Sequence, residues 1–224
     1  MHAPEVFMVI YGRLFERFGP RSWWPAETPF EVCVGAILTQ NTAWSNVEKA
    51  VSALKQAAIL TPVAMRAVEE KQLAQLIRPA GYFNVKSQRL KEFVGWLFDQ
   101  HNGLLEHMFT VEWRRLRAEL LQVRGIGPET ADAILLYAGH KPTFVVDAYT
   151  RRLFYRFGLL PEDAGYEQTR QLCMAHLPAD VPLFNEYHAL IVEQCKQFCR
   201  KKPLCNGCPL HGDCLQKGRT YLIQ

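Results

Sequence analysis

Apolar residues recur at three- and four-residue spacing along most of this chain, which is the pattern of amphipathic α-helices. The ranges that carry this spacing are 4–18, 61–78, 86–100, 112–121, 147–157 and 181–199. Residues 30–57 predict two further helices, separated by the polar break Thr39-Gln40-Asn41-Thr42. Breaks are also expected at Gly19-Pro20 and at residues 80–84, where glycine or proline interrupts the pattern.

The best-defined break lies between two helical runs at Gly125-Ile126-Gly127. Glycine permits a tight turn and a close backbone approach to a ligand, and Pro128 is suited to the first position of a new helix. The free amides at such a tip favour an anion such as a DNA phosphate, which would be gripped without reading the bases. On the glycines alone, an ordinary turn between packed helices is the favoured interpretation, because short glycine motifs are weak signals.

Downstream, the apolar pair Val145-Val146 leads into Asp147, and a helix carrying Arg151 and Arg152 follows. The carboxylate of Asp147 is a candidate for chemistry. It is also suited to the N-cap of the helix that follows it, because aspartate accepts hydrogen bonds from first-turn amides.

The composition allows one large or two small hydrophobic cores, since 49% of the 224 residues are hydrophobic. The formal net charge of +4 is compatible with nucleic acid but does not demand it. The N-terminus lacks the pattern of a signal peptide, and no run of about twenty apolar residues predicts a membrane span. We therefore expect a cytoplasmic protein.

Four of the seven cysteines crowd the C-terminus with the spacing C-x5-C-x2-C-x5-C. These four are Cys199, Cys205, Cys208 and Cys214. In a chain that is not exported, this spacing indicates a metal site, and a structural zinc ion and a [4Fe–4S] cluster both fit it. Cys195 is an alternative first ligand, whereas Cys33 and Cys173 are expected to be buried.

Aromatic and polar residues outside these motifs have two interpretations each. Trp23 and Trp24 precede a proline, and Trp44 stands near a helix start. They would belong either to a hydrophobic core or to a pocket on which a flipped base stacks. Lys86 and Arg89 would form a solvated face or contact phosphate.

Taken together, the segments LxxVxGIGxxTA and VVDxxxRR resemble the helix-hairpin-helix DNA glycosylases, the superfamily of endonuclease III. The resemblance implies an all-α fold with two lobes. A six-helix barrel containing the hairpin would span residues 21–135, and the second lobe would combine residues 1–20 with 136–224. The resemblance also selects the [4Fe–4S] cluster, held in a loop at 199–214, although its first gap is one residue shorter than in endonuclease III.

The resemblance also implies roles for individual residues. Asp147 would stabilise the cation-like transition state at C1′ and orient water, and Gln40, with Asn41 beside it, would fill the gap left by the extruded nucleotide. The hairpin residues Gly125, Ile126 and Gly127 and the basic residues Arg200, Lys201 and Lys202 would hold the DNA backbone.

Glu129 is the main departure from the family pattern, because bifunctional members carry a lysine here that forms a Schiff base with C1′. We therefore predict a monofunctional glycosylase with weak or absent AP lyase activity.

Trp23-Trp24-Pro25, AILTQNTAW and GIGPETADAIL are similar to the bacterial 3-methyladenine DNA glycosylases, some of which lack the cluster. This similarity implies alkylated purines as substrate, in an aromatic pocket formed by Trp23, Trp24 and Trp44. The alternatives are an endonuclease III-like enzyme for oxidised pyrimidines and a non-catalytic DNA-binding protein. The expected partner is damaged double-stranded DNA, bound by a monomer at the bacterial nucleoid.

Overall fold

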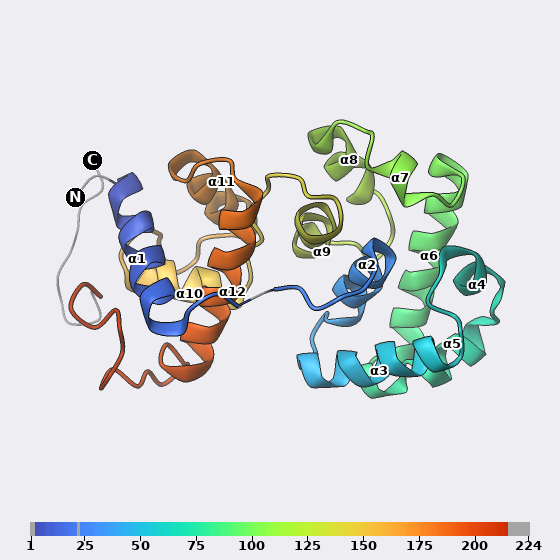
Figure 1. The fold of residues 1–224 in the computed structure, drawn as a ribbon, viewed down its shortest axis with the longest axis horizontal. Helices are drawn as coiled ribbons and strands as arrows, with labels where there is room; N and C mark the ends of the chain where they lie inside the picture. The colour runs from blue at the N-terminus through green and yellow to red at the C-terminus, as the bar shows by residue number, and fades with distance from the viewer. Residues whose placement is uncertain (1–2, 22, 215–224) are drawn as a thin grey trace. The chain divides into compact units, whose positions relative to one another are not determined.

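The computed structural model describes residues 3–21 and 23–214, with side chains described from residue 5 onward. In this part of the chain it contains helices and no strand, which confirms the all-α fold class (Figure 1). The chain forms two compact units, Met1–Trp24 with Pro142–Gln224, and Pro25–Lys141. Their interpretation as a cluster lobe and a six-helix barrel stays a prediction.

The unit Pro25–Lys141 is built around α2 (Pro29–Leu38), which is buried at every position from Phe30 to Leu38. Apart from Glu31 this helix is apolar on all sides, so it packs against α3, α6, α9 and η2 at once. The helices of this unit besides α2 are α3 (Trp44–Gln56), α4 (Pro62–Ala67), α5 (Glu70–Leu76), η1 (Arg78–Ala80), α6 (Phe83–His101), α7 (Leu105–Met108), α8 (Trp113–Leu120), α9 (Pro128–Ala133) and the π-helical η2 (Ile134–Ala138).

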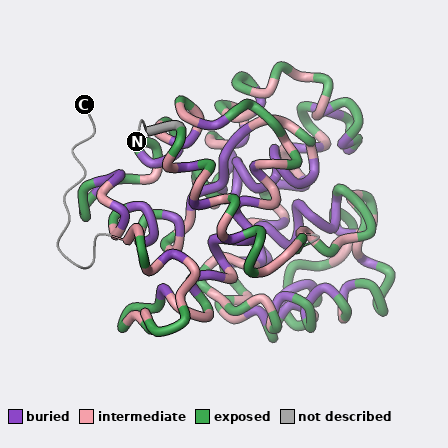
Figure 2. Tube along the Cα trace, turned by 60° about the vertical axis from the view of Figure 1, so that its left-hand side comes forward, coloured by how far each residue is buried: buried purple, intermediate pink, exposed green. Residues whose placement is uncertain are grey.

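The other unit is organised around α12 (Val181–Gln197), which packs against α1 and α10. The remaining helices are α1 (Ala3–Phe18), α10 (Ala148–Arg156) and α11 (Tyr166–His176). Phe7 of α1 meets Phe154 of α10 edge to face at 4.9 Å, and Tyr187 of α12 donates a hydrogen bond of 2.8 Å to the carbonyl of Phe7. In Figure 2 buried and exposed positions alternate along most of the helices, because each of these helices turns one face to a core.

One predicted helix was wrong, because residues 61–78 form two short helices and a 3-10 turn. Val68 and Glu69 are extended and separate α4 from α5. The ammonium of Lys91, from α6, donates to the carbonyls of Met65 and Arg66 at 2.9 Å each and so caps the end of α4. The apolar spacing does not report this break, since both helices place apolar residues on the same core.

In the described part of the chain, no helix is long and apolar enough to cross a membrane.

A buried ion pair joins α8 to α9 on either side of the predicted hairpin. The guanidinium of Arg117 binds the carboxylate of Asp132 with two hydrogen bonds of 2.8 and 2.9 Å, and the Asp132 side chain is fully buried. Removing one charge of such a pair leaves the other uncompensated away from water. We expect Asp132→Asn to lower the free energy of unfolding in urea by about 3 kcal/mol.

Glu119→Gln is the matched control, because Glu119 pairs with the exposed Arg115. Surface ion pairs contribute about 1 kcal/mol or less, so this variant should unfold almost as the wild type does. Equal unfolding free energies for the two variants would show that the buried ion pair stabilises the fold no more than the exposed one.

Candidate functional site

The predicted hairpin is present between α8 and α9. Gly125 has φ +90°, a conformation that favours glycine, and Gly127 is extended at the N-cap of α9, with Pro128 at its first position. Ile126 is buried, and its amide donates to the carbonyl of Val123 at 3.0 Å. First-turn amides of a helix have no partner within that helix, so the hairpin presents donors that suit an anion.

The side chain of Arg89, from α6, lies against Gly125 of this hairpin. A Cβ atom on Gly125 would lie 2.3 Å from Cγ of Arg89, which is too short for two carbon atoms that are not bonded to each other. The same Arg89 donates from Nη1 to Oε1 of Gln40. Its side chain therefore fills the space beside Gly125 and reaches the turn between α2 and α3.

Gln40 is bound to the hairpin rather than extended into solvent. Its Nε2 donates to the carbonyl of Gly125 at 3.0 Å and to Oγ1 of Thr130 at 2.9 Å. Asn41, next along the chain, is exposed and has φ +53°. The two predicted DNA-contacting elements of this unit are thus joined through one amide side chain, and Asn41 is the exposed residue of the pair.

The prediction of a solvated face or a phosphate contact was wrong for Lys86. The side chain of this residue is buried, and its ammonium donates to the carbonyls of Leu38 at 2.9 Å and Ala80 at 2.7 Å. Burial, with a smaller contribution from the positive charge of Arg89, lowers the pKa of Lys86 to about 8. The reason for its burial is that the last carbonyls of α2 lack partners within the helix, and Lys86 supplies a donor.

Glu129 lies exposed in the first turn of α9. A carboxylate at this position interacts favourably with the positive end of the helix dipole. A carboxylate cannot form a Schiff base with a sugar carbon, so this position offers no amine nucleophile.

Asp147 lies in the other unit and is the N-cap of α10, so it has the capping role that the sequence allows. Its Oδ1 accepts hydrogen bonds from the amide of Thr150 at 2.7 Å and from Oγ1 of Thr150 at 2.9 Å. Both bonds go to one carboxylate oxygen, and Asp147 is partly exposed whereas Thr150 is buried. The carboxylate is therefore held in one orientation at the surface of its unit.

The three tryptophans predicted to line a base pocket are all partly exposed. Trp23 and Trp24 meet edge to face with ring centroids 5.7 Å apart. Trp44 opens α3 in the other unit. Their role as a pocket stays a prediction.

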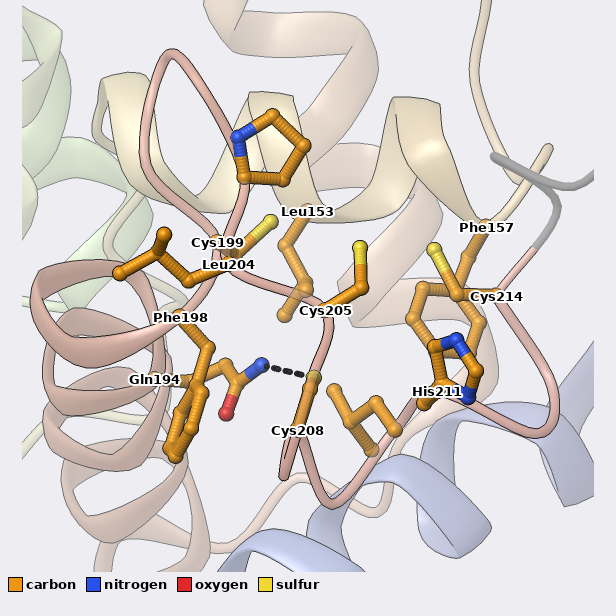
Figure 3. Close-up of a pocket in the computed structure, with 12 residues that line it drawn as sticks. Leu153, Phe157, Gln194, Phe198, Cys199, Leu204, Cys205, Cys208, His211 and Cys214 are labelled. Carbon is orange, nitrogen blue, oxygen red and sulfur yellow. Dashed lines mark hydrogen bonds between the residues drawn. The ribbon is translucent and has the colours of Figure 1, made fainter.

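The four C-terminal cysteines line one cavity, together with apolar side chains from α10 and from the cysteine segment itself (Figure 3). The apolar residues include Leu153, Phe157, Phe198 and Leu210. Cys33 and Cys173 are buried elsewhere, as predicted, and burial raises the pKa of both thiols. Cys195, the alternative ligand, is buried and does not line this cavity.

Nitrogen donors approach two of the four sulfur atoms. Nη1 of Arg156 lies 3.1 Å from Sγ of Cys199, and Nε2 of Gln194 lies 3.0 Å from Sγ of Cys208. A hydrogen bond from Cys195, together with Arg156 and the charge of Arg152, lowers the pKa of Cys199 below its usual value. The surroundings of the first cysteine thus favour a thiolate, which is the form that binds metal.

Within the described residues, no group of three or more His, Cys, Asp or Glu side chains is arranged to hold a metal ion. The four cysteines share a cavity without converging on one point. The prediction of a metal at this site therefore rests on their spacing and on the donors around them.

The basic segment after Cys199 is held by its backbone. Arg152 donates to the carbonyl of Cys199 at 2.8 Å, and Arg156 donates to the carbonyls of Arg200 and Lys201 at 2.8 and 3.1 Å. The side chains of Arg200, Lys201 and Lys202 are exposed. A clamped backbone with exposed cationic side chains is an arrangement suited to a phosphate chain.

Several residues of these sites were not singled out as such from the sequence. They are Thr150, Gln194, Arg156 and Thr130. Only Thr150 and Arg156 left a usable signal, the first as a hydroxyl three residues after an N-cap and the second as a cation one turn after Arg152.

Residues 34–179 match the family described as the HhH-GPD superfamily base excision DNA repair protein. The chain belongs to this superfamily. A protein of Methanocaldococcus jannaschii whose name assigns it to the DNA repair glycosylases is 48% identical over 214 residues, which cover 95% of this chain and 97% of that protein. The chain is accordingly a base excision DNA repair glycosylase of the endonuclease III-like type.

Two solved structures are similar in fold to this chain. The 3-methyladenine DNA glycosylase (MagIII) from H. pylori, solved bound to 1,N6-ethenoadenine, has a TM-score of 0.77 and 28% identity, covering 88% of this chain and 98% of that one. A trapped endonuclease III–DNA covalent intermediate has a TM-score of 0.81 at 22% identity, covering 98% and 100%. The second likeness concerns the fold alone.

Proposed function

We propose that this glycosylase is monofunctional and hydrolyses the N-glycosidic bond of an alkylated purine flipped out of duplex DNA. Two observations carry the proposal: the carboxylate of Asp147 is held in one orientation, and position 129 holds a glutamate instead of the lysine expected of a lyase. Water is then the nucleophile that these residues can support, since no amine stands where the lyase lysine is expected.

Asp147 acts on the sugar. Its carboxylate stabilises the positive charge that develops at C1′ as the bond to the base lengthens, and it orients the attacking water. Thr150 holds Oδ1, so Oδ2 is the oxygen available to the reacting centre. A positively charged alkylated base needs little further activation, because it leaves as a neutral purine.

Base recognition and DNA binding belong to the remaining predicted residues. Trp23, Trp24 and Trp44 offer aromatic faces, on which a cationic base stacks favourably. Support for an alkylated purine comes from the likeness to MagIII, whose structure holds 1,N6-ethenoadenine. The hairpin at Gly125–Gly127 and the exposed cations after Cys199 would bind phosphates, and Asn41 and Gln40 would fill the vacated position in the duplex.

We also propose that the four cysteines hold a [4Fe–4S] cluster. Zinc binds sulfur at about 2.3 Å, so its four thiolates must converge closely on one ion. A cluster gives each thiolate its own iron, so the sulfur atoms stay farther apart around a shared cavity. When bound, the cluster would hold the basic segment beside α10, a stabilisation that this short segment cannot obtain from a core of its own.

The function is tested with end-labelled duplexes that carry one 1,N6-ethenoadenine, one 7-methylguanine or one thymine glycol. We expect strand breaks at the alkylated purines that exceed those of a protein-free lane and appear only after hot alkali, because base release leaves an intact abasic strand. Breaks without alkali would overturn the monofunctional assignment.

A second candidate, an endonuclease III-like enzyme for oxidised pyrimidines, is favoured by the fold likeness to endonuclease III. Release restricted to thymine glycol would support that candidate. Tight binding of all three duplexes without release from any would instead identify a non-catalytic DNA-binding protein. We expect the active species to be a monomer acting on chromosomal DNA.

A further inference from the structure

The cavity formed by the four cysteines contains a polar side chain that packing alone does not explain. Gln194 of α12 is 1% exposed, and its Oε1 is buried with no hydrogen-bond partner in the described part of the chain. Burying an amide with an unsatisfied carbonyl is unfavourable, and leucine or methionine would fill the same space. The compensating contact is the 3.0 Å bond from Nε2 to Sγ of Cys208, drawn as a dashed line in Figure 3.

That bond is weak with a thiol and strong with a thiolate. A neutral sulfur is a poor acceptor, whereas a charged acceptor shortens and strengthens an N–H bond. The opposite amide orientation would point Oε1 at the sulfur and repel a thiolate. The burial of Gln194 is therefore accounted for when Sγ of Cys208 is a ligand of the cluster, because a metal-bound thiolate is a charged acceptor.

A second donor comes from a different helix to a different sulfur. Arg156, at the end of α10, directs Nη1 to Sγ of Cys199 at 3.1 Å and also donates to the carbonyls of the next two residues. These carbonyl bonds fix the guanidinium against the loop. A positive charge is thus held beside one ligand sulfur, and a neutral amide N–H beside another.

We infer that Gln194 and Arg156 are the donors that raise the reduction potential of the [4Fe–4S] cluster held by the four cysteines. The inference rests on the cofactor part of the proposed function. Reduction adds one electron to the cluster and so increases the negative charge shared by its thiolates. Hydrogen bonds and positive charge at the sulfur atoms stabilise the reduced form more than the oxidised form.

The test uses anaerobically purified, cluster-loaded full-length protein. Iron and sulfide per chain, visible absorbance and reduction potential are measured for Gln194→Leu, Arg156→Met and the double variant. We expect each single change to shift the potential in the negative direction, and the double variant to shift it by roughly the sum, because the donors act on separate sulfur atoms.

Gln197→Leu is the matched control. Gln197 lies in the same helix, binds Glu193 and does not line the cavity, so its replacement should leave the potential at the wild-type value. An unchanged potential in fully loaded Gln194→Leu would overturn the inference. So would a wild-type chain that binds zinc and no iron.

If the Gln194→Leu chain fails to hold iron, iron retention becomes the readout. Gln194→His keeps an N–H donor and should restore retention, whereas Gln194→Met has a similar length without a donor and should not. Equal iron in these two variants would overturn the inference. Base release from the ethenoadenine duplex, measured on the same preparations, reports separately on the glycosylase assignment.

Discussion

Replacing Asp147 by asparagine should lower the single-turnover rate of base release by roughly 10²- to 10³-fold. The reason is that the amide has the shape of the carboxylate but lacks the charge that stabilises the cation at C1′. The fold should persist, because asparagine is as good an N-cap as aspartate and can still accept the two bonds from Thr150. The rate is measured with excess protein on an ethenoadenine duplex.

Asp163→Asn is the control for this variant. Asp163 is exposed in the same unit, and its replacement removes the same charge from the protein without touching α10. Both variants should match the wild type in thermal unfolding and in affinity for undamaged duplex. A rate for Asp147→Asn within a factor of about three of the Asp163→Asn rate would remove Asp147 from the catalytic assignment.

The local parts of these sites were predictable from the sequence because they depend on neighbouring residues. Glycine at a positive φ, proline at the first helical position and aspartate at an N-cap each act within a few residues of the chain. The hairpin and the cap at Asp147 therefore appear in the structure where the sequence placed them. The cysteine spacing likewise brought the four thiols to one cavity.

The contacts that the sequence does not show join residues far apart in the chain. Gln40, predicted to contact DNA, binds residues 85 and 90 positions away in the free protein, and its contact with DNA stays a prediction. Lys86 looks like a surface lysine in its helix, and only the packing of α6 beside the end of α2 turns it into a buried donor. Gln194 carries no sequence signal either, since its partner Cys208 lies in an irregular segment.

The hydrogen bonds of Gln40 give this side chain a structural role in the hairpin. Arg89 and Thr130 hold the amide from two sides, so this side chain contributes to the shape of the hairpin in the free protein. To enter a duplex, Gln40 would have to exchange these bonds for contacts with DNA, whereas Asn41 is already exposed. Any change that disturbs Arg89 or Gly125 should therefore affect both predicted DNA-contacting elements together.

The Gly125→Ala variant should show this joint effect on the hairpin and on the turn at Gln40 most clearly. A Cβ atom at Gly125 is strained at φ +90° and collides with Cγ of Arg89, so we expect a loss of roughly 2–3 kcal/mol in unfolding free energy. Affinity for duplex DNA should fall as well, because displaced Arg89 releases Gln40 from the hairpin. Urea unfolding and fluorescence anisotropy on a labelled duplex measure the two effects.

Gly127→Ala tests the same substitution two residues along the same turn. Gly127 is extended, and a Cβ atom there meets nothing within 4 Å, so only the weaker capping by alanine, about 1 kcal/mol, should be lost. The collision itself is isolated in an Arg89→Ala background, where Gly125→Ala should cost about 1 kcal/mol less than in the wild type. Equal costs in both backgrounds would mean that backbone strain at Gly125, and not its contact with Arg89, governs the hairpin.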